Sequence, residues 1–246
     1  MQLYFIRHGQ SVNNAGWGEL DYKEHPDPAL TEIGIQQAQI LADFLEMNQP
    51  IMKYEGWDPT NRYGYGITHL YASLMERAVH TASHTADRLK IPFEAWDIHE
   101  SGGIFGRDEE MKLKGLPGKP RLFFETNFPE FSLPDTLDEG GWWRERPFET
   151  EEECQLRAKR IWQELLTRHG DRDGQPEQRI AFVSHGGFFM HLMCAILDLP
   201  WKNASHGLKS WFLLNNCSLS RIDIRDGYVT ICYLNRTDHL SADRIT

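Results

Sequence analysis

Residues 2–11 read QLYFIRHGQS, and this stretch decides the expected fold. The run from Gln2 to Ile6 is short and largely apolar, with aromatic and β-branched members, which is typical of a buried strand. It ends abruptly at Arg7, His8 and Gly9, so polar and charged groups follow the strand directly. Because ligands of an open parallel sheet bind beyond the carboxyl ends of its strands, the stretch predicts a site at this point.

Similar apolar runs recur along the chain and alternate with helical patterns. Further strands are predicted at 67–72, 93–98 and 179–184, and near 211–215, 218–224 and 228–234. Helices are predicted from Thr31, over 74–89, from Thr150 to Gly170, and after Gly186-Gly187. The alternation predicts an α/β fold, a three-layer sandwich with a mostly parallel sheet and helices on both faces. Asp226-Gly227 predicts a terminal antiparallel hairpin.

Residues 1–246 are expected to form a single domain, with one segment, 101–149, outside the alternation. This segment is rich in glycine, proline and aromatic residues. A long ordered loop of this kind is usually a lid or a binding element, and we expect it to lie over the carboxyl ends of the strands. Its aromatic side chains could stack on an apolar or ring-bearing leaving group, and its basic side chains could meet extra negative charge. A small helix or hairpin with its own core, or a dimer contact, stays open.

The composition excludes several classes of protein. Hydrophobic residues make up 40% and charged residues 25%, which is ordinary for a globular protein. With 26 basic and 36 acidic residues the net charge is −10, so neither nucleic acid nor a membrane surface is the expected partner. The four cysteines contain no CxxC pair, which argues against a zinc knuckle or a redox pair. No leader or membrane-spanning stretch is recognised, and a cytoplasmic protein is expected.

Polar residues that follow the predicted strands form one constellation. Its members are Arg7, His8, Arg77, Glu100 and His185. Guanidinium groups bind a phosphoryl group bidentately, and a helix N-terminus adds backbone N–H groups. A neutral imidazole can attack phosphorus, and a carboxyl group can protonate the leaving oxygen. The set therefore favours chemistry on an anionic phosphoryl group.

A metal centre is the main alternative for two histidines and a glutamate. A fixed cation, Arg7, adjoins His8 and is unfavourable beside a metal, and the chain has no HExxH spacing. The pair His80 and His84 is four residues apart on one predicted helix. We interpret this pair as an exposed helix face.

The stretch Arg7-His8-Gly9-Gln10-Ser11, placed after a short N-terminal strand, resembles the first motif of the histidine phosphatase superfamily, phosphoglycerate-mutase-like branch. Further motifs follow in the family's order: Asp27-Pro28 with Leu30, Thr31, Gly34, Gln37 and Ala38; Ser73 with Arg77, Ala78, Thr81 and Ala82; Glu100; Ser184-His185-Gly186-Gly187; and Asn216, Asn235 and His239-Leu240. The resemblance covers nearly the whole chain outside 101–149.

The resemblance implies a role for each matched residue. His8 would be the nucleophile that forms a phosphohistidine, and Glu100 would be the general acid and later the base. The phosphoryl group would be bound by Arg7, Asn14, Arg77, His185 and Gly186. Carboxylates that stay open as alternatives for the acid are Asp97, Asp108, Glu109 and Glu110. No metal and no cofactor is implied. Thr31 is expected to cap a helix and Gly34 to allow close packing. Ser73 could help to hold the phosphate loop or cap its helix, and the cap is favoured.

Two departures from the family's mutases favour a phosphatase. Mutases carry an Asn-Arg-Phe-x-Gly-Trp pattern, whereas this chain has Asn14-Ala15-Gly16-Trp17. Around the acid, mutases favour Glu-Arg-x-Tyr-Gly, whereas Glu100 is followed by Ser101-Gly102. A mutase must hold a second anionic group, and these basic residues are missing. The expected function is hydrolysis of small phosphate monoesters, with a phosphoglycerate mutase or a catalytically silent binding relative as alternatives; assembly into a homo-oligomer stays open.

Overall fold

A computed structural model describes residues 1–20, 22–50, 52, 54, 56–144, 146–170, 176–200 and 212–246. In this part of the chain a seven-stranded sheet has the order β6-β3-β2-β7-β1-β8-β9. Its strands are β1 (Gln2–Arg7), β2 (His69–Ala72), β3 (Phe93–Ala95), β6 (Phe131–Ser132), β7 (Arg179–Ser184), β8 (Leu219–Arg225) and β9 (Tyr228–Arg236). The pairs among β6, β3, β2, β7 and β1 are parallel, and β8 and β9 are antiparallel to their neighbours. The predicted mostly parallel sheet is confirmed.

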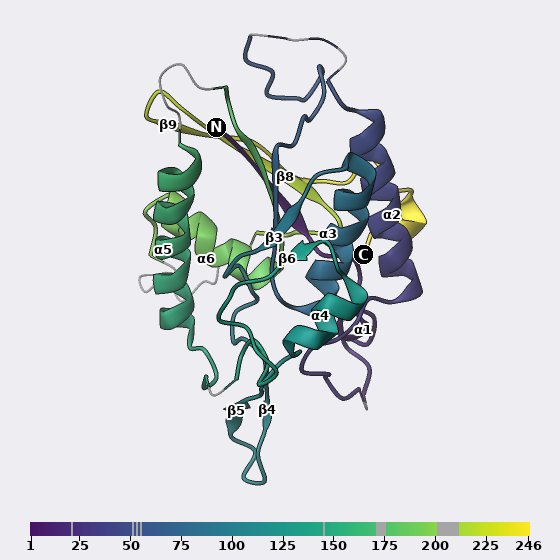
Figure 1. Cartoon of the computed structure of the whole chain (residues 1–246), viewed down its shortest axis with the longest axis vertical. Helices are drawn as coiled ribbons and strands as arrows, with labels where there is room; N and C mark the ends of the chain where they lie inside the picture. The colour runs from purple at the N-terminus through teal and green to yellow at the C-terminus, as the bar shows by residue number, and fades with distance from the viewer. Residues whose placement is uncertain are drawn as a thin grey trace.

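Helices cover both faces of the sheet (Figure 1). They are α2 (Glu32–Met47) and α3 (Glu76–Leu89) on one face, and α5 (Glu151–His169) and α6 (Gly186–Ile196) on the other. The two helices on each face bury apolar stripes against the strands. Leu41 of α2 and Ile161 of α5 belong to these stripes, and both are fully buried. This arrangement confirms the predicted three-layer α/β sandwich.

The ends of α2 and α5 follow the predicted capping residues. The Thr31 side chain accepts a hydrogen bond from the Gly34 amide at 3.0 Å and begins α2. Thr150 and Glu153 form a reciprocal capping box at the start of α5, which ends at Gly170. A four-residue helix, α1 (Val12–Ala15), was not predicted, and Ser11 caps it in the same reciprocal way.

The expected strand near 211–215 is wrong for residues 212–215, and residue 211 lies outside the described residues. The backbone groups of this stretch bind side chains instead of a neighbouring strand. The Leu214 carbonyl accepts from the Arg7 guanidinium, and the Asn215 amide donates to the Asn235 side chain at 2.6 Å.

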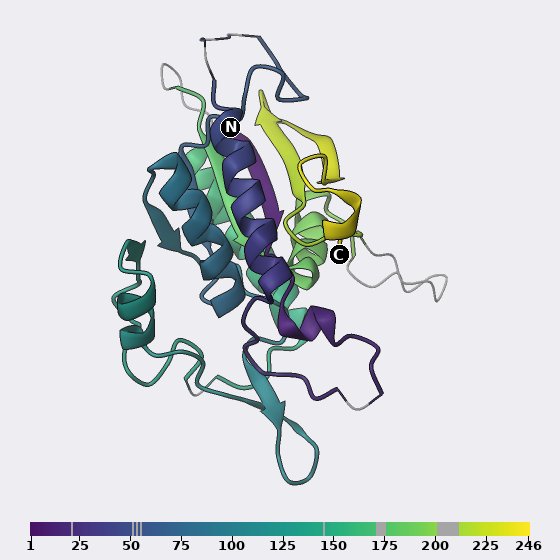
Figure 2. The same cartoon turned by 90° about the vertical axis from the view of Figure 1, so that its right-hand side faces the viewer.

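Segment 101–149 has two parts. The first is a hairpin of β4 (Phe105–Arg107) and β5 (Leu113–Gly115), which projects from one end of the molecule (Figure 2). The second contains α4 (Arg121–Asn127) and β6, and β6 extends the main sheet at its β3 edge. Aromatic side chains of the second part, including Phe124, Phe131 and Trp142, join the core beneath α2 and α3. The open alternative of a separate small core therefore does not describe this part.

A short 3₁₀ turn, η1 (Ala242–Arg244), follows β9. Within the described ranges, no helix has the length and apolar content that crossing a bilayer requires.

Candidate active site

The three central strands bring two histidines and a serine to one edge of the sheet. β1, β7 and β2 are adjacent and parallel, and Arg7 pairs in register with Ser184. The residues directly after these strands are therefore neighbours. The imidazole rings of His8 and His185 lie 5.0 Å apart, centre to centre, and His185 contacts the Ser73 hydroxyl at 2.9 Å through Nε2.

His8 is held with one ring nitrogen committed to the backbone. Its Nδ1 lies 2.7 Å from the Gly9 carbonyl, which can only accept, so Nδ1 carries the proton. Its Nε2 accepts from Nε of Arg77 at 3.1 Å. Burial, followed by the charges of Arg77 and Arg7, holds the pKa of His8 well below its usual value. The imidazole is therefore neutral at pH 7, with its lone pair on Nε2.

Arg77 is buried at the start of α3 beside a buried carboxylate. Its Nη1 lies 3.7 Å from Oδ1 of Asp27, which also accepts from the Glu76 amide at 3.2 Å. Burial raises the pKa of Asp27 to about 6, although the Arg77 charge opposes this. Burial also lowers the pKa of Arg77. Asp27 therefore orients a guanidinium group that the protein shields from water.

Three buried nitrogens at this edge have no hydrogen-bond partner within the described residues. They are Nε of Arg7, Nη1 of Arg77 and Nδ1 of His185. A buried polar group without a partner is uncommon and costs about 1–3 kcal/mol. Unsatisfied donors on residues so close to His8 fit a bound group that is rich in acceptor oxygens.

Glu100 sits at the N-terminus of α6. Its Oε1 accepts from the amides of Ser101 at 2.8 Å and Phe188 at 3.0 Å, and its Oε2 accepts from Gly187 at 3.3 Å. A Cβ atom on Gly187 would lie 2.2 Å from Oε1 of Glu100. Glycine at this position lets the carboxylate approach the helix.

The loop after β1 is fixed by close backbone packing. A Cβ on Gly34 would lie 2.0 Å from the Gln10 carbonyl, which explains the close-packing role expected of this glycine. The Gly9 amide donates to the Thr81 hydroxyl at 3.0 Å. Asn216 donates through Nδ2 to the carbonyl of His8 at 2.8 Å and to the side chain of Asn14 at 3.1 Å.

A buried ion network lies behind Glu100. Arg157 of α5 binds Glu149 bidentately, with both N–O distances 2.7 Å. Its Nη1 donates to the carbonyls of Asp97 and His99 at 3.0 and 3.1 Å. Because His99 directly precedes Glu100, and Glu149 closes segment 101–149, the network fixes both ends of this segment.

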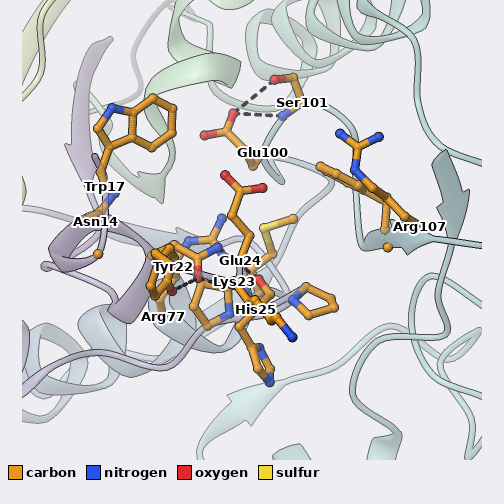
Figure 3. A pocket seen from close by; sticks show the side chains of 18 of the residues that line it. Asn14, Trp17, Tyr22, Lys23, Glu24, His25, Arg77, Glu100, Ser101 and Arg107 are labelled. Atoms are coloured by element: carbon orange, nitrogen blue, oxygen red, sulfur yellow. Dashed lines mark hydrogen bonds between the residues drawn. The ribbon is translucent and has the colours of Figure 1, made fainter. Parts of the chain in front are cut away.

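A cleft of about 1020 Å³ opens from this edge (Figure 3). Arg77 and Glu100 lie at its inner end, and its walls come from residues 13–28 and from the β4–β5 hairpin. Of the aromatic and basic side chains in segment 101–149, the described lining contains Phe105 and Arg107. The other aromatic and basic side chains of this segment do not belong to the described lining of the cleft. Trp143, for example, is buried in the core.

The structure brings the predicted site residues together at this edge: Arg7, His8, Asn14, Arg77, Glu100, His185 and Gly186. The alternative acids lie elsewhere. Asp97 contacts His99 at 2.9 Å, and its pKa is lowered by His99 and Arg157 despite burial. Asp108, Glu109 and Glu110 are exposed on the hairpin turn. In the described residues, no group of three or more His, Cys, Asp or Glu side chains is arranged to hold a metal ion.

The role expected of Ser73 is wrong in its detail. The N-cap of α3 is Met75, without a side-chain capping bond. The Ser73 hydroxyl accepts from the Met75 amide at 3.1 Å and contacts His185. It therefore orients the second histidine as well as the turn that leads into the helix.

Sequence reasoning proposed a binding element in segment 101–149 but missed the other wall of the cleft, from residues 13–28, and the buried network. Trp17 and Met111 line the cleft from residues without a recognisable motif. Arg157 gave a usable signal, because a charged residue falls on the otherwise apolar stripe of Cys154, Ala158 and Ile161.

The architecture and the site define a class of α/β proteins in which histidines and arginines meet at the carboxyl edge of a parallel sheet. The sequence model of the histidine phosphatase superfamily (branch 1) matches residues 3–54 and 61–237, and the chain belongs to this superfamily.

Several known proteins resemble the chain. The curated probable phosphoglycerate mutase GpmB of Yersinia pestis (strain Pestoides F) is 26% identical over 231 residues, which cover 92% of this chain and 86% of that protein. A phosphoserine phosphatase variant from Entamoeba histolytica, solved with phosphoserine, superimposes with a TM-score of 0.58 at 19% identity, covering 98% of this chain and 99% of that one. A mycobacterial glucosyl-3-phosphoglycerate phosphatase gives 0.54 at 20% identity, covering 96% and 99%. These structures share the fold.

Proposed function

We propose that this chain is a metal-independent phosphatase that hydrolyses small phosphate monoesters through a phosphohistidine on His8. The observation that carries the proposal is the state of the His8 ring. Nδ1 is bound to the Gly9 carbonyl, and the depressed pKa keeps Nε2 unprotonated. A neutral, oriented imidazole in contact with Arg77, which lines the cleft, is an activated nucleophile. Solved relatives that act on phosphoserine and glucosyl-3-phosphoglycerate support the same chemistry.

The first step transfers the phosphoryl group to the protein. Nε2 of His8 attacks phosphorus, the bond from phosphorus to the alcohol oxygen breaks, and the carboxyl group of Glu100 gives that oxygen a proton. The Nδ1–H bond to Gly9 supports the positive charge that develops on the ring. Arg7, Arg77 and His185 bind the phosphoryl oxygens and stabilise charge in the transition state.

The second step restores the protein. Water attacks the phosphohistidine, Glu100 takes the proton from the water, and the nitrogen–phosphorus bond breaks to release phosphate. The electron pair returns to Nε2 of His8. Asn14, linked through Asn216 to the His8 carbonyl, and the amide of Gly186 are the proposed secondary phosphate contacts.

Phosphate release from an aryl phosphate in excess chelator tests this proposal. The wild type is expected to release phosphate, and His8→Ala is expected to lose about 10⁴-fold or more of the rate. His80→Asn is the matched control, because His80 stacks on His84 and lines a different cavity from the cleft, so this change should leave the rate unchanged. Equal activity in His8→Ala and wild type would contradict the nucleophile assignment.

A second measurement separates hydrolysis from mutase-type transfer, which the names of the curated relatives suggest. The wild type is loaded with ³²P from a labelled bisphosphoglycerate, and the fate of the label is followed in the presence of phosphoglycerate. Release as inorganic phosphate supports a phosphatase. Transfer to phosphoglycerate faster than to water would establish the mutase instead.

A further inference from the structure

Two segments project from the body of the molecule toward the same end (Figure 2), and residues of both line the cleft. One is the Trp17 arm, residues 16–20 and 22–25, which follows α1. The other is the β4–β5 hairpin. The described lining of the cleft includes Trp17 and Tyr22 from the arm and Phe105 and Met111 from the hairpin. The outer cleft therefore has aromatic and apolar groups on both walls.

The Trp17 arm is anchored at its base. The Tyr22 hydroxyl donates to Oδ1 of Asn13 at 2.6 Å, and Nδ2 of Asn13 donates to the His25 carbonyl at 2.9 Å. A Cβ atom on Gly16 would lie 2.3 Å from the Tyr22 ring, so the ring packs directly on the backbone. The base is fixed, whereas the indole of Trp17 remains 80% exposed at the cleft.

The hairpin places Met111 where its backbone would favour glycine. The Met111 amide donates to the Asp108 carbonyl at 3.0 Å, and Met111 has a φ of 63°. This left-handed conformation is unfavourable for most side chains by about 1–2 kcal/mol, and glycine adopts it freely. The Met111 side chain is nevertheless 66% exposed and lines the cleft. Such a residue stabilises neither the turn nor the core, which points to a role in contact with a ligand.

The charges on the outer walls cancel. Apart from Arg77 and Glu100, the cleft is lined by two cations, Lys23 and Arg107, and by two anions, Glu19 and Glu24, together with His25. The walls therefore offer no strong net charge to a second anionic group. Their distinctive feature is apolar surface, and covering it on binding stabilises a complex by about 25 cal/mol per Å².

We propose that the cleft selects phosphate monoesters of bulky, largely apolar alcohols, and that it holds the leaving group between Trp17 and Met111. This inference rests on the proposed phosphatase function, in which the leaving group points away from His8 toward the opening. Trp17 supplies a flat ring for stacking, and the flexible Met111 thioether adapts to the opposite face.

Two aryl esters whose parent phenols have similar acidity test this proposal. They are phenyl phosphate and 2-naphthyl phosphate, which differ in apolar area while the chemical step stays comparable. We expect the wild type to favour the naphthyl ester by roughly tenfold in kcat/KM. Trp17→Ala and Met111→Gly are expected to reduce this ratio toward one. Glycine suits the turn, so Met111→Gly should fold at least as well as the wild type.

Matched controls come from exposed apolar residues of the same two segments. Leu20 on the arm is fully exposed and does not belong to the described lining of the cleft, and the same holds for the exposed Leu113 on β5. Leu20→Ala and Leu113→Ala should keep the wild-type ratio. A ratio near one in the wild type, or an unchanged ratio in both Trp17→Ala and Met111→Gly, would overturn the proposal.

Binding measurements keep this test separate from that of the proposed function. Calorimetric titration of the two esters into His8→Ala measures the preference without turnover. Tighter binding of the naphthyl ester, and its loss in the double variant that also carries Trp17→Ala, supports a leaving-group site between Trp17 and Met111. This holds even if the wild type hydrolyses neither ester. Equal affinities of the two esters overturn the proposed leaving-group site, but they do not contradict hydrolysis that depends on His8. Self-association that disappears in Trp17→Ala, seen by sedimentation, would overturn it in favour of a contact between copies.

Discussion

Beside the inner end of the cleft, which Arg77 lines, His8, Arg77 and His185 are buried, and each follows closely on a strand or begins a helix. At its outer end, Trp17 and Met111 are mostly exposed and lie on a loop and a hairpin turn. The inner groups are fixed by the sheet and by hydrogen bonds from several elements, whereas the outer ones can change without disturbing the core. The difference separates the proposed chemistry, which needs fixed geometry, from the choice of leaving group.

After the loss of His8, the largest effect is expected when the proposed acid, Glu100, is neutralised. Glu100→Gln should lower kcat/KM by about 10²–10⁴-fold for an alkyl phosphate, because a poor leaving group needs the proton. The loss should be smaller for an activated aryl phosphate. Steady-state kinetics on both esters provide the measurement, with Glu110→Gln on the exposed hairpin turn as the control. Equal losses on the two esters would remove Glu100 from the acid role.

The network behind Glu100 offers a comparison of buried and exposed ion pairs on one helix. Arg157→Met should lower the free energy of unfolding by about 3–5 kcal/mol, because it leaves the buried Glu149 carboxylate unpaired. Arg160 lies on α5 as well and pairs with Asp97, but its side chain is 50% exposed. Arg160→Met should therefore lower the free energy of unfolding by no more than about 1 kcal/mol. Urea unfolding of both variants measures the two values. Similar losses in the two variants would show that burial does not set the cost of losing these arginines.

Adjacent glycines allow a finer test of the inner geometry. Gly187→Ala would place a methyl group 2.2 Å from the resting position of Oε1 of Glu100, so the carboxylate must move. We expect a loss of about 10–100-fold in kcat/KM for an alkyl phosphate, since small displacements at a reacting group are costly. Gly186→Ala keeps its backbone amide and meets Nε of Arg7 at 3.9 Å, so its loss should be smaller. The reverse order would show that the position of Glu100 is not limiting.

The smallest effect is a dependence of stability on pH. Burial holds the pKa values of His8 and His185 well below 6.5, so the folded state does not take up protons that the unfolded chain binds. The free energy of unfolding should therefore fall as the pH drops below 6.5, by up to about 1.4 kcal/mol per pH unit for each imidazole. Asp27, with a pKa raised to about 6, acts in the opposite direction.

Urea unfolding between about pH 7.5 and pH 5.5 measures this slope. His8→Ala should flatten it in part, because the variant lacks one of the imidazoles whose pKa burial lowers. His169, His191 and His239 act in the same direction as His8 and remain in the variant. His25→Ala changes an exposed residue of the Trp17 arm, so it should leave the slope as it is in the wild type. An unchanged slope in His8→Ala would contradict the neutral state assigned to this ring.

The elements with one clear local signal could be predicted from the sequence. The apolar run 179–184 and the capping residues Thr31 and Thr150 act through neighbours in the chain, so their patterns are visible there. The site could be predicted because the residues after parallel strands meet at one edge. The backbone of 212–215 could not, since its partners, Arg7 and Asn235, are distant in sequence.

Two further features depend on tertiary contacts without a local pattern. β6 is two residues long, and its pairing with β3 decides that half of segment 101–149 belongs to the main sheet. That Trp17 and Met111 line the same cleft depends on how two separate loops project from the fold. Neither the length nor the spacing of these loops in the sequence specifies that geometry.

The position of β1 in the sheet also bears on how the protein folds. β1 begins the chain, yet its two neighbours, β7 and β8, come from the last third of the 246 residues. Closing loops of this length makes such pairings slow, so the first strand remains without its partners until most of the chain is available. Helical structure, in contrast, can form early from local contacts. In a refolding experiment, far-ultraviolet circular dichroism should thus recover before the cleft forms, and catalytic activity becomes a specific marker for the final pairing of β1.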